Sequence, residues 1–258
     1  MRPLRPTTDV VGYRVIRRLC GVLVAVILTG CLPLPEVPTP PGDLVETGGI
    51  GVSEGIGLVA RLTFDQNIDA SSTVSLVGTE WVPGVSLDAL AFTGAGSYAR
   101  LDNHPNTDLP EQGSLVAWVR PDPHTNNAEI IRKGDGASAD WLLQFWQAQG
   151  QLALFLIKDS GPWGELYSNL WLPEGIWAHV TATWDQLEMR LYINGVLDAS
   201  APNPISPVQS TGNVILFGNI PGDPSDGFVG AVDDLQIYDR ALTPTEVERV
   251  YRTGWPQE

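Results

Sequence analysis

The stretch Glu188-Met189-Arg190-Leu191-Tyr192-Ile193-Asn194-Gly195-Val196-Leu197 contains the clearest local structure in the chain. Met189, Leu191 and Ile193 alternate with more polar residues, and a period of two is typical of a strand with one buried face. Asn194-Gly195 then forms the strongest two-residue hairpin signal, because both residues tolerate a positive φ. The stretch therefore predicts two antiparallel strands joined by a tight turn.

Similar short apolar runs recur along the 258-residue chain, separated by Gly, Asn, Asp and Pro. Residues 115–120, 151–158, 176–184 and 213–218 are the clearest, and the run at 151–158 is apolar on both faces, as expected of a covered central strand. One helix is predicted from Thr243 to about Arg252, because Thr243-Pro244-Thr245-Glu246 has the pattern of a capping box with proline at the first helical position. We therefore expect one all-β sandwich over residues 56–258 with a short C-terminal helix.

The N-terminal residues predict export. Arg14, Arg17 and Arg18 precede an apolar run, which is typical of a secretory signal peptide, here over residues 1–30. Leu28-Thr29-Gly30-Cys31 resembles the lipobox of bacterial lipoproteins, which implies lipidation of Cys31; the alternative is an ordinary signal peptide with a coincidental cysteine. Residues 31–55 are rich in Pro and Gly and are expected to form a tether. The predicted location is the bacterial cell envelope, at the outer membrane if the host is Gram-negative.

The charge of the exported part limits its partners. Residues 31–258 carry 10 basic and 29 acidic side chains, a net charge of −19. Such a body repels phosphate backbones, which excludes nucleic-acid binding. It is compatible with divalent cations and with neutral polymers such as glycans.

Five blocks of sequence follow one another in an order that recurs in a known family. They are Ala89–Gly94 (ALAFTG), Ser114–Pro121 (SLVAWVRP), Trp177–Asp185 (WAHVTATWD), Leu191–Gly195 (LYING) and Phe228–Leu242 (FVGAVDDLQIYDRAL). Together they resemble the laminin-G-like, concanavalin A-like lectin/glucanase domains of bacterial surface proteins, with Trp184 where tyrosine is usual. The resemblance implies a jelly-roll sandwich of two curved antiparallel sheets, but it does not imply one function, because one fold hosts many.

Two acidic positions are candidates for binding Ca²⁺. Alternation places Asp233 in phase with Val229, Leu235 and Ile237, and a buried carboxylate needs hydrogen-bond donors or a cation. The loop Asp65-Gln66-Asn67-Ile68-Asp69 spaces several oxygen ligands in one turn, which suits Ca²⁺. In the resembling family the first and last strands often share a calcium, which implies a structural site at Asp65 and Asp233, joined by Asn67 or Asp69. The alternative is that Asp233 accepts backbone hydrogen bonds and that residues 65–69 form a solvated turn.

Aromatic residues gather between residues 141 and 171. Gly161-Pro162-Trp163-Gly164 predicts an indole at a loop tip, and glycan sites stack sugars on such rings and add a few polar side chains. The core remains an open alternative for Trp141, Trp146 and Trp171 individually. The candidate ligand-binding residues are Trp141, Trp146, Trp163, Tyr167 and Trp171.

A second group of residues is predicted to be structural. Trp118, Trp177 and Trp184 are expected in the core, and His179 is expected to make a structural hydrogen bond. Arg132-Lys133 precedes the turn Gly134-Asp135-Gly136 and is expected to form a solvated edge rather than an anion site.

The sequence carries no recognisable pair of catalytic acids. The Glu-x-Asp-x-x-Glu strand that retaining hydrolases on a jelly roll share has no counterpart here. We therefore expect a non-catalytic carbohydrate-binding module on the cell envelope, with a glycan or surface polymer as its partner. A protein–protein adhesion or envelope-scaffolding module is the alternative, and a glycoside hydrolase or lyase is less favoured.

Overall fold

A computed structural model of the chain describes residues 57–65, 74–123, 127–135, 139–146, 150–158, 163–223 and 227–254. The predicted signal peptide, the tether, Cys31, Asn67 and Asp69 lie outside these ranges. Within them, no helix has the length and apolar character that a membrane crossing requires.

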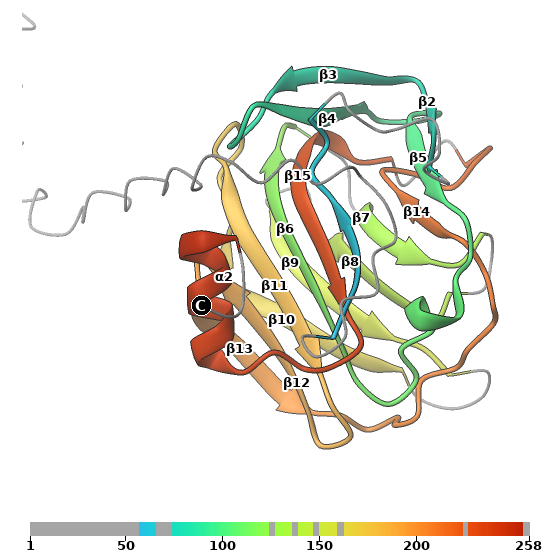
Figure 1. Ribbon diagram of the computed structural model, residues 1–258, viewed down its shortest axis with the longest axis vertical. Helices are drawn as coiled ribbons and strands as arrows, with labels where there is room; N and C mark the ends of the chain where they lie inside the picture. The colour runs from blue at the N-terminus through green and yellow to red at the C-terminus, as the bar shows by residue number, and fades with distance from the viewer. Residues whose placement is uncertain are drawn as a thin grey trace, which may run out of the picture. The chain divides into compact units, whose positions relative to one another are not determined.

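Strands dominate the described residues and form two antiparallel sheets, as predicted (Figure 1). The first sheet has the order β13-β12-β11-β6-β15-β4-β3, with β1 paired to β15. Its strands are β1 (Leu58–Leu62), β3 (Thr79–Pro83), β4 (Asp88–Thr93), β6 (Gly113–Pro121), β11 (Ala178–Trp184), β12 (Glu188–Ile193), β13 (Val196–Pro202) and β15 (Val229–Tyr238).

The second sheet has the order β10-β9-β8-β7-β14-β5-β2. Its strands are β2 (Val74–Val77), β5 (Tyr98–Leu101), β7 (Ala128–Lys133), β8 (Trp141–Phe145), β9 (Gln151–Leu156), β10 (Gly164–Trp171) and β14 (Ile215–Phe217). A 3₁₀ turn, η1 (Pro105–Thr107), and a helix, α2 (Pro244–Thr253), complete the described elements.

The predicted hairpin is confirmed as the β12–β13 turn. Asn194 and Gly195 have φ values of 50° and 77°, the left-handed pair that this turn requires. Two hydrogen bonds join the turn to the neighbouring strand β11. The Asn194 N–H donates to the His179 carbonyl, and the Asn194 Oδ1 accepts from the His179 N–H at 2.9 Å. A Cβ at Gly195 would lie 2.9 Å from the Tyr251 ring, so helix packing also requires glycine here.

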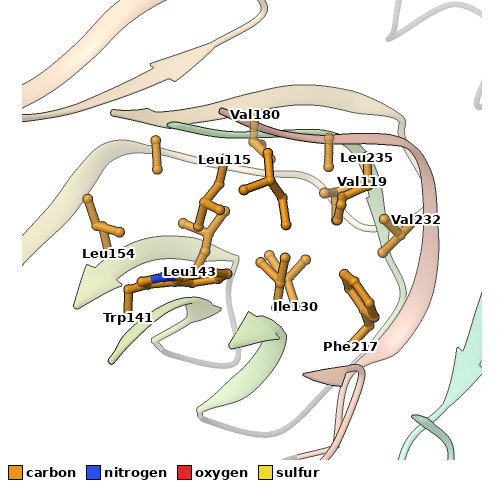
Figure 2. Close-up of a cluster of buried hydrophobic side chains, with 14 of the residues drawn as sticks. Leu115, Val119, Ile130, Trp141, Leu143, Leu154, Val180, Phe217, Val232 and Leu235 are labelled. Atoms are coloured by element: carbon orange, nitrogen blue, oxygen red, sulfur yellow. The ribbon is translucent and has the colours of Figure 1, made fainter. Parts of the chain in front are cut away.

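The hydrophobic core lies between the two sheets. Figure 2 shows Leu115, Val119 and Val180 of the first sheet facing Ile130 and Leu143 of the second. Trp141 and Trp184 meet in this interior with ring centroids 6.3 Å apart, and both side chains are fully buried. Trp184 and Trp118 are buried, as predicted. Trp177 is only partly buried, and the Arg120 guanidinium lies 5.3 Å from its ring centroid.

Helix α2 covers part of the outer face of the first sheet (Figure 1). Thr243 caps it in a capping box with Glu246, and Gly254 ends it in the left-handed conformation, as the sequence predicts. Val247 and Val250 pack on Leu58, Val116, Tyr192 and Tyr238. Tyr192 lies on the more polar of the two faces of β12, and α2 buries it, so β12 is covered on both faces at this position.

Arg132 and Lys133 are buried, so the prediction of a solvated edge is wrong. Arg132 donates to both carboxylate oxygens of Glu129, at 2.9 and 3.1 Å. The Lys133 side chain is fully buried, and its Nζ lies 3.0 Å from Asp108, 2.7 Å from Asn103 and 2.9 Å from Thr107. These partners come from the segment around η1, which the local sequence near residue 133 does not reveal.

Candidate functional site

The candidate binding surface is the outer face of the second sheet, on strands β8, β9 and β10. Leu143 and Phe145 of β8 and Leu152, Leu154 and Leu156 of β9 point into the core. Alternation therefore turns Leu142 and Gln144 of β8, with Ala153 and Phe155 of β9, to the opposite face, where a separate apolar cluster forms.

Four aromatic rings contact one another on this face, and we call them the aromatic cluster: Trp146, Phe155, Trp163 and Tyr167. The ring centroids of Trp146 lie 5.7 Å from those of both Phe155 and Tyr167. Phe155 also meets Tyr167 at 5.9 Å and Trp163 at 6.3 Å, both edge to face. Phe155 is almost fully buried beneath the other rings, whereas Trp163 is 51% exposed. The cluster thus presents an indole to solvent on a rigid aromatic base.

Three of the five predicted ligand-binding aromatics belong to this cluster. Trp141 does not, because it points into the core between the sheets (Figure 2), so its assignment to the binding surface is wrong. Trp171 is 41% exposed at the far end of β10, beyond a bulge that separates it from Tyr167. Phe155 was not predicted as a binding-surface residue. Its alternation with Leu154 and Leu156 in the run at 151–158 could have placed it on the face opposite the core.

The polar groups beside the aromatic cluster are engaged with one another. The Tyr167 hydroxyl donates to Glu165 Oε2 at 2.8 Å, and desolvation, with the nearby Glu165 carboxylate, raises the pKa of Tyr167 to about 12. Glu129 and Arg132 form their ion pair on the same outer face, where Glu129 pairs across the strands with Gln144. The tyrosine therefore stays a neutral hydrogen-bonding group at physiological pH.

Asp233, the predicted metal ligand, is fully buried, as expected. Its Oδ2 accepts hydrogen bonds from the Val85 and Ser86 N–H groups at 2.8 and 3.2 Å, and its Oδ1 accepts from the Asp234 N–H at 2.8 Å. Burial and repulsion by Asp234 nevertheless raise the pKa of Asp233 to about 8. Among the described residues, the Asp233 carboxylate has backbone donors but no paired cationic side chain.

The prediction that Asp233 shares one face of β15 with Val229, Leu235 and Ile237 is only partly right. Asp233 pairs with Trp118 and Gln236 pairs with Val116, so a bulge separates the two halves of β15. Asp234, in the left-handed region at φ 44°, is the extra residue. Asp233 therefore lies on the outer face with Trp118, whereas Leu235 and Ile237 point into the core.

Asp65 lies near this acidic region. Its Oδ1 accepts a long hydrogen bond, 3.4 Å, from the Asp88 N–H, and burial raises its pKa. Asp234 forms an ion pair with Arg61 at 3.2 Å, yet burial keeps its pKa raised, and the charge of Asp65 adds to the rise. In the part of the chain that the structure describes, no group of three or more His, Cys, Asp or Glu side chains is arranged to hold a metal.

The imidazole of His179 makes no hydrogen bond with the described residues, so the structural hydrogen bond that we expected is not found. Its ring packs edge to face on Trp118, with centroids 5.2 Å apart, and lies 5.5 Å from Tyr251. The Nδ1 atom is buried and has no hydrogen-bond partner among the described residues. Desolvation lowers the pKa of His179 to about 3, so the imidazole is neutral.

A separate pocket of about 370 Å³ is lined by Glu111, Gln112, Asp185, Gln186 and Leu187. Asp185 accepts from the Leu187 and Glu188 N–H groups and pairs with Arg190 at 3.1 Å. Although partial burial opposes the change, these contacts lower the pKa of Asp185. An ionised, fully engaged carboxylate is unsuited to act as a general acid.

Comparison with known proteins supports the fold. The model of the concanavalin A-like lectin/glucanases superfamily matches residues 93–248, more than half of the chain. Domain 4 of AbnA, an extracellular arabinanase from Geobacillus stearothermophilus solved in complex with arabinotriose, superposes with a TM-score of 0.62 and 22% identity. That match covers 80% of this chain and all of the domain. The binding domain of Paraclostridial Mosquitocidal Protein 1 superposes with a TM-score of 0.59 and 18% identity, over 71% of this chain and 48% of that one.

Among curated proteins, the chain is similar to adhesion G-protein coupled receptor D1. It is 29% identical to the Homo sapiens protein over 131 residues, which is 50% of this chain and 14% of the receptor. It is 32% identical to the Bos taurus protein over 104 residues, or 38% of this chain and 10% of the receptor. The chain therefore corresponds to a small part of these relatives.

Proposed function

Since this chain belongs to the concanavalin A-like lectin/glucanase superfamily, we propose that it is a non-catalytic glycan-binding module whose binding surface is the aromatic cluster. The observation that carries the proposal is the half-exposed Trp163 indole, supported from beneath by Phe155 and flanked by Trp146 and Tyr167. A rigid aromatic surface loses little conformational entropy when a flat sugar ring stacks on it.

The structural neighbours support a binding role. Several are binding domains by name, and one is a domain of an arabinanase solved with arabinotriose. The acidic side chains near the cluster also support a role without catalysis, because Glu129 is paired with Arg132 and Glu165 accepts from Tyr167. A retaining or inverting hydrolase needs one carboxyl group that can give up a proton and a second that acts as nucleophile or base.

A glycan array probed with the full chain and with its Trp163→Ala variant tests the proposal. We expect binding to at least one polysaccharide, reduced at least tenfold by the substitution. The Trp81→Ala variant is the matched control, because Trp81 is also exposed, at 36%, but lies on the edge strand β3 of the other sheet. If no polysaccharide binds, or if the two variants weaken binding equally, the proposed function is wrong.

We also propose that the protein is displayed on the bacterial cell envelope through a lipid on Cys31, with residues 31–55 as the tether. The lipobox-like sequence Leu28–Cys31 supports this proposal. A Cys31→Ser variant should move from the detergent phase to the aqueous phase in a detergent partition assay. Partition of the unsubstituted chain into the aqueous phase would contradict the anchor.

A structural Ca²⁺ ion is a further part of the proposal. The charge of Asp234 raises the pKa of Asp233, and the charge of Asp65 raises the pKa of Asp234, so a cation beside these carboxylates would relieve their repulsion. Asp65 and Asp233 would bind it with Asn67 or Asp69. Ca²⁺ at a hundred times its Kd would stabilise the fold by about 2.7 kcal/mol, or roughly 5–10 °C in Tm. An unchanged Tm after chelation of Ca²⁺-loaded protein would contradict this site.

Protein–protein adhesion is the second candidate function, and one observation favours it. Leu170 and Trp171 of β10 and Val196 and Leu197 of β13 are exposed apolar residues, and Asp198 joins the two strand edges by accepting from the Asn169 and Leu170 N–H groups. Exposed apolar patches of this kind are common at protein interfaces. A Leu197→Asp variant that abolishes attachment to cells while glycan binding persists would favour adhesion.

A further inference from the structure

Glu165 lies among the residues of the aromatic cluster. It is directly opposite Phe155 in the pairing of β10 with β9, and the Cβ atoms of such pairs are about 5 Å apart. Along the chain, Glu165 stands two residues after Trp163 and two residues before Tyr167. Leu166 points into the core, so alternation turns Glu165 and Tyr167 to the outer face. Aromatic side chains therefore adjoin Glu165 both along its own strand and across to the next one.

The carboxylate of Glu165 has no cationic partner. Its Oε2 accepts a hydrogen bond from the Tyr167 hydroxyl at 2.8 Å, and within the described part of the chain this is its one polar contact. Glu165 is also the only charged residue in β8, β9 and β10. The charge of Glu129, farther along the same face, is balanced by Arg132. The three strands that carry the aromatic cluster thus hold one uncompensated negative charge.

A ligand can reach the carboxylate and the indole together, because the side chains of Glu165 and Trp163 are both exposed. The Tyr167 hydroxyl uses its proton on Glu165, so it offers a ligand only its oxygen lone pairs. The groups beside the indole are therefore acceptors, and they require a ligand that donates hydrogen bonds.

The donor that fits best is a positively charged one. The faces of Trp and Tyr rings attract ammonium groups, and a charged donor binds a carboxylate more strongly than a neutral hydroxyl does. The net charge of −19 on residues 31–258 also attracts cationic polymers and repels anionic ones. A sugar with a free amino group combines an apolar face for stacking on Trp163 with an ammonium group for Glu165.

We propose that the glycan site selects sugars with a free amino group, and that Glu165 is the residue that determines this specificity by binding the ammonium group beside the Trp163 indole. This inference rests on the proposed function and names the class of its ligand. N-acetylation of the amine removes the positive charge and should therefore weaken binding.

The test is calorimetric titration of the full chain with chitosan oligomers and with fully N-acetylated chitin oligomers of the same length, in a mildly acidic buffer in which the free amines are protonated. The unsubstituted chain should bind the chitosan oligomer at least tenfold more tightly. Glu165→Gln keeps the size of the side chain and an acceptor for Tyr167 but removes the charge. It should weaken chitosan binding at least tenfold and leave chitin binding unchanged.

Glu80→Gln is the matched control. Glu80 is exposed next to Trp81 on β3 of the other sheet, and this variant changes the net charge by the same amount. Its affinity for the chitosan oligomer should stay unchanged. Equal weakening by Glu80→Gln and Glu165→Gln would show attraction by the whole acidic body and would overturn the inference.

The remaining outcomes separate this inference from the proposed function. Equal affinity for the two oligomers, or equal weakening of both by Glu165→Gln, would overturn the inference while binding that Trp163→Ala abolishes leaves the glycan site intact. Failure of both oligomers to bind, when a neutral glycan of the array binds through Trp163, would likewise overturn only the inference. Absence of binding to every glycan would overturn the proposed function, and this inference with it.

Discussion

Truncation of Lys133 should destabilise the fold more than truncation of the other lysine. The chain has two lysines, Lys133 and Lys158. Lys133 is fully buried with three polar partners, whereas Lys158 is exposed at the end of β9. Lys133→Ala leaves the Asp108 carboxylate without its cation and the Asn103 and Thr107 oxygens without their donor.

The expected cost follows from this geometry. Removal of one partner of a buried ion pair costs about 3–5 kcal/mol. Because Asp108 keeps part of its side chain in solvent, at 24% exposure, we expect the lower end, about 3 kcal/mol. For a domain of this size each kcal/mol corresponds to roughly 2–4 °C, so Tm should fall by about 6–12 °C. Lys158→Ala should change the free energy of unfolding by less than about 0.5 kcal/mol.

Urea unfolding of both variants measures the difference, and amine acetylation of the native protein provides an independent check. Mass spectrometry should find Lys158 acetylated and Lys133 unmodified until the protein unfolds. Equal stabilities of the two variants, or acetylation of both lysines at one rate in the native state, would refute this account of β7.

Two further predictions concern the packing of α2 on the first sheet. The pKa of His179 is lowered to about 3 in the folded chain, so the unfolded chain binds a proton more readily below pH 6.5. The free energy of unfolding should therefore decrease by up to about 1.4 kcal/mol per pH unit from pH 6.5 towards pH 3. Urea titrations at several pH values should show a flatter slope for His179→Phe. Gly195→Ala should destabilise the fold by about 1–3 kcal/mol, because φ is 77° and the Cβ would meet Tyr251 at 2.9 Å; a Tm within 1 °C of the unsubstituted protein, roughly the precision of the assay, would contradict that reading.

The features that the sequence predicted correctly depend on neighbours along the chain. The β12–β13 turn needs two residues that accept positive φ, and the start of α2 needs Thr243 and Glu246 three residues apart. Both requirements are visible in short stretches. The jelly-roll arrangement of two antiparallel sheets became predictable only through the resemblance of the five blocks to a family.

The features that the sequence did not predict depend on distant segments or on one irregular residue. The left-handed Asp234 shifts the alternation of β15, so Asp233 and Leu235 face opposite sides of the sheet. The partners of Lys133 lie about 25–30 residues earlier in the chain. Trp141, in contrast, was open to prediction, because it lies an odd number of residues from Trp146 on one extended segment and so belongs to the opposite face.

Calorimetric titration of the full chain with the polysaccharide that binds best on the array is the most direct test of a glycan site on the outer face of the second sheet. We predict measurable heat of binding for the unsubstituted chain and for Trp81→Ala. For Trp163→Ala we predict at least a tenfold rise in Kd, equivalent to about 1.4 kcal/mol. An unchanged Kd for Trp163→Ala would place the binding surface elsewhere and contradict the account.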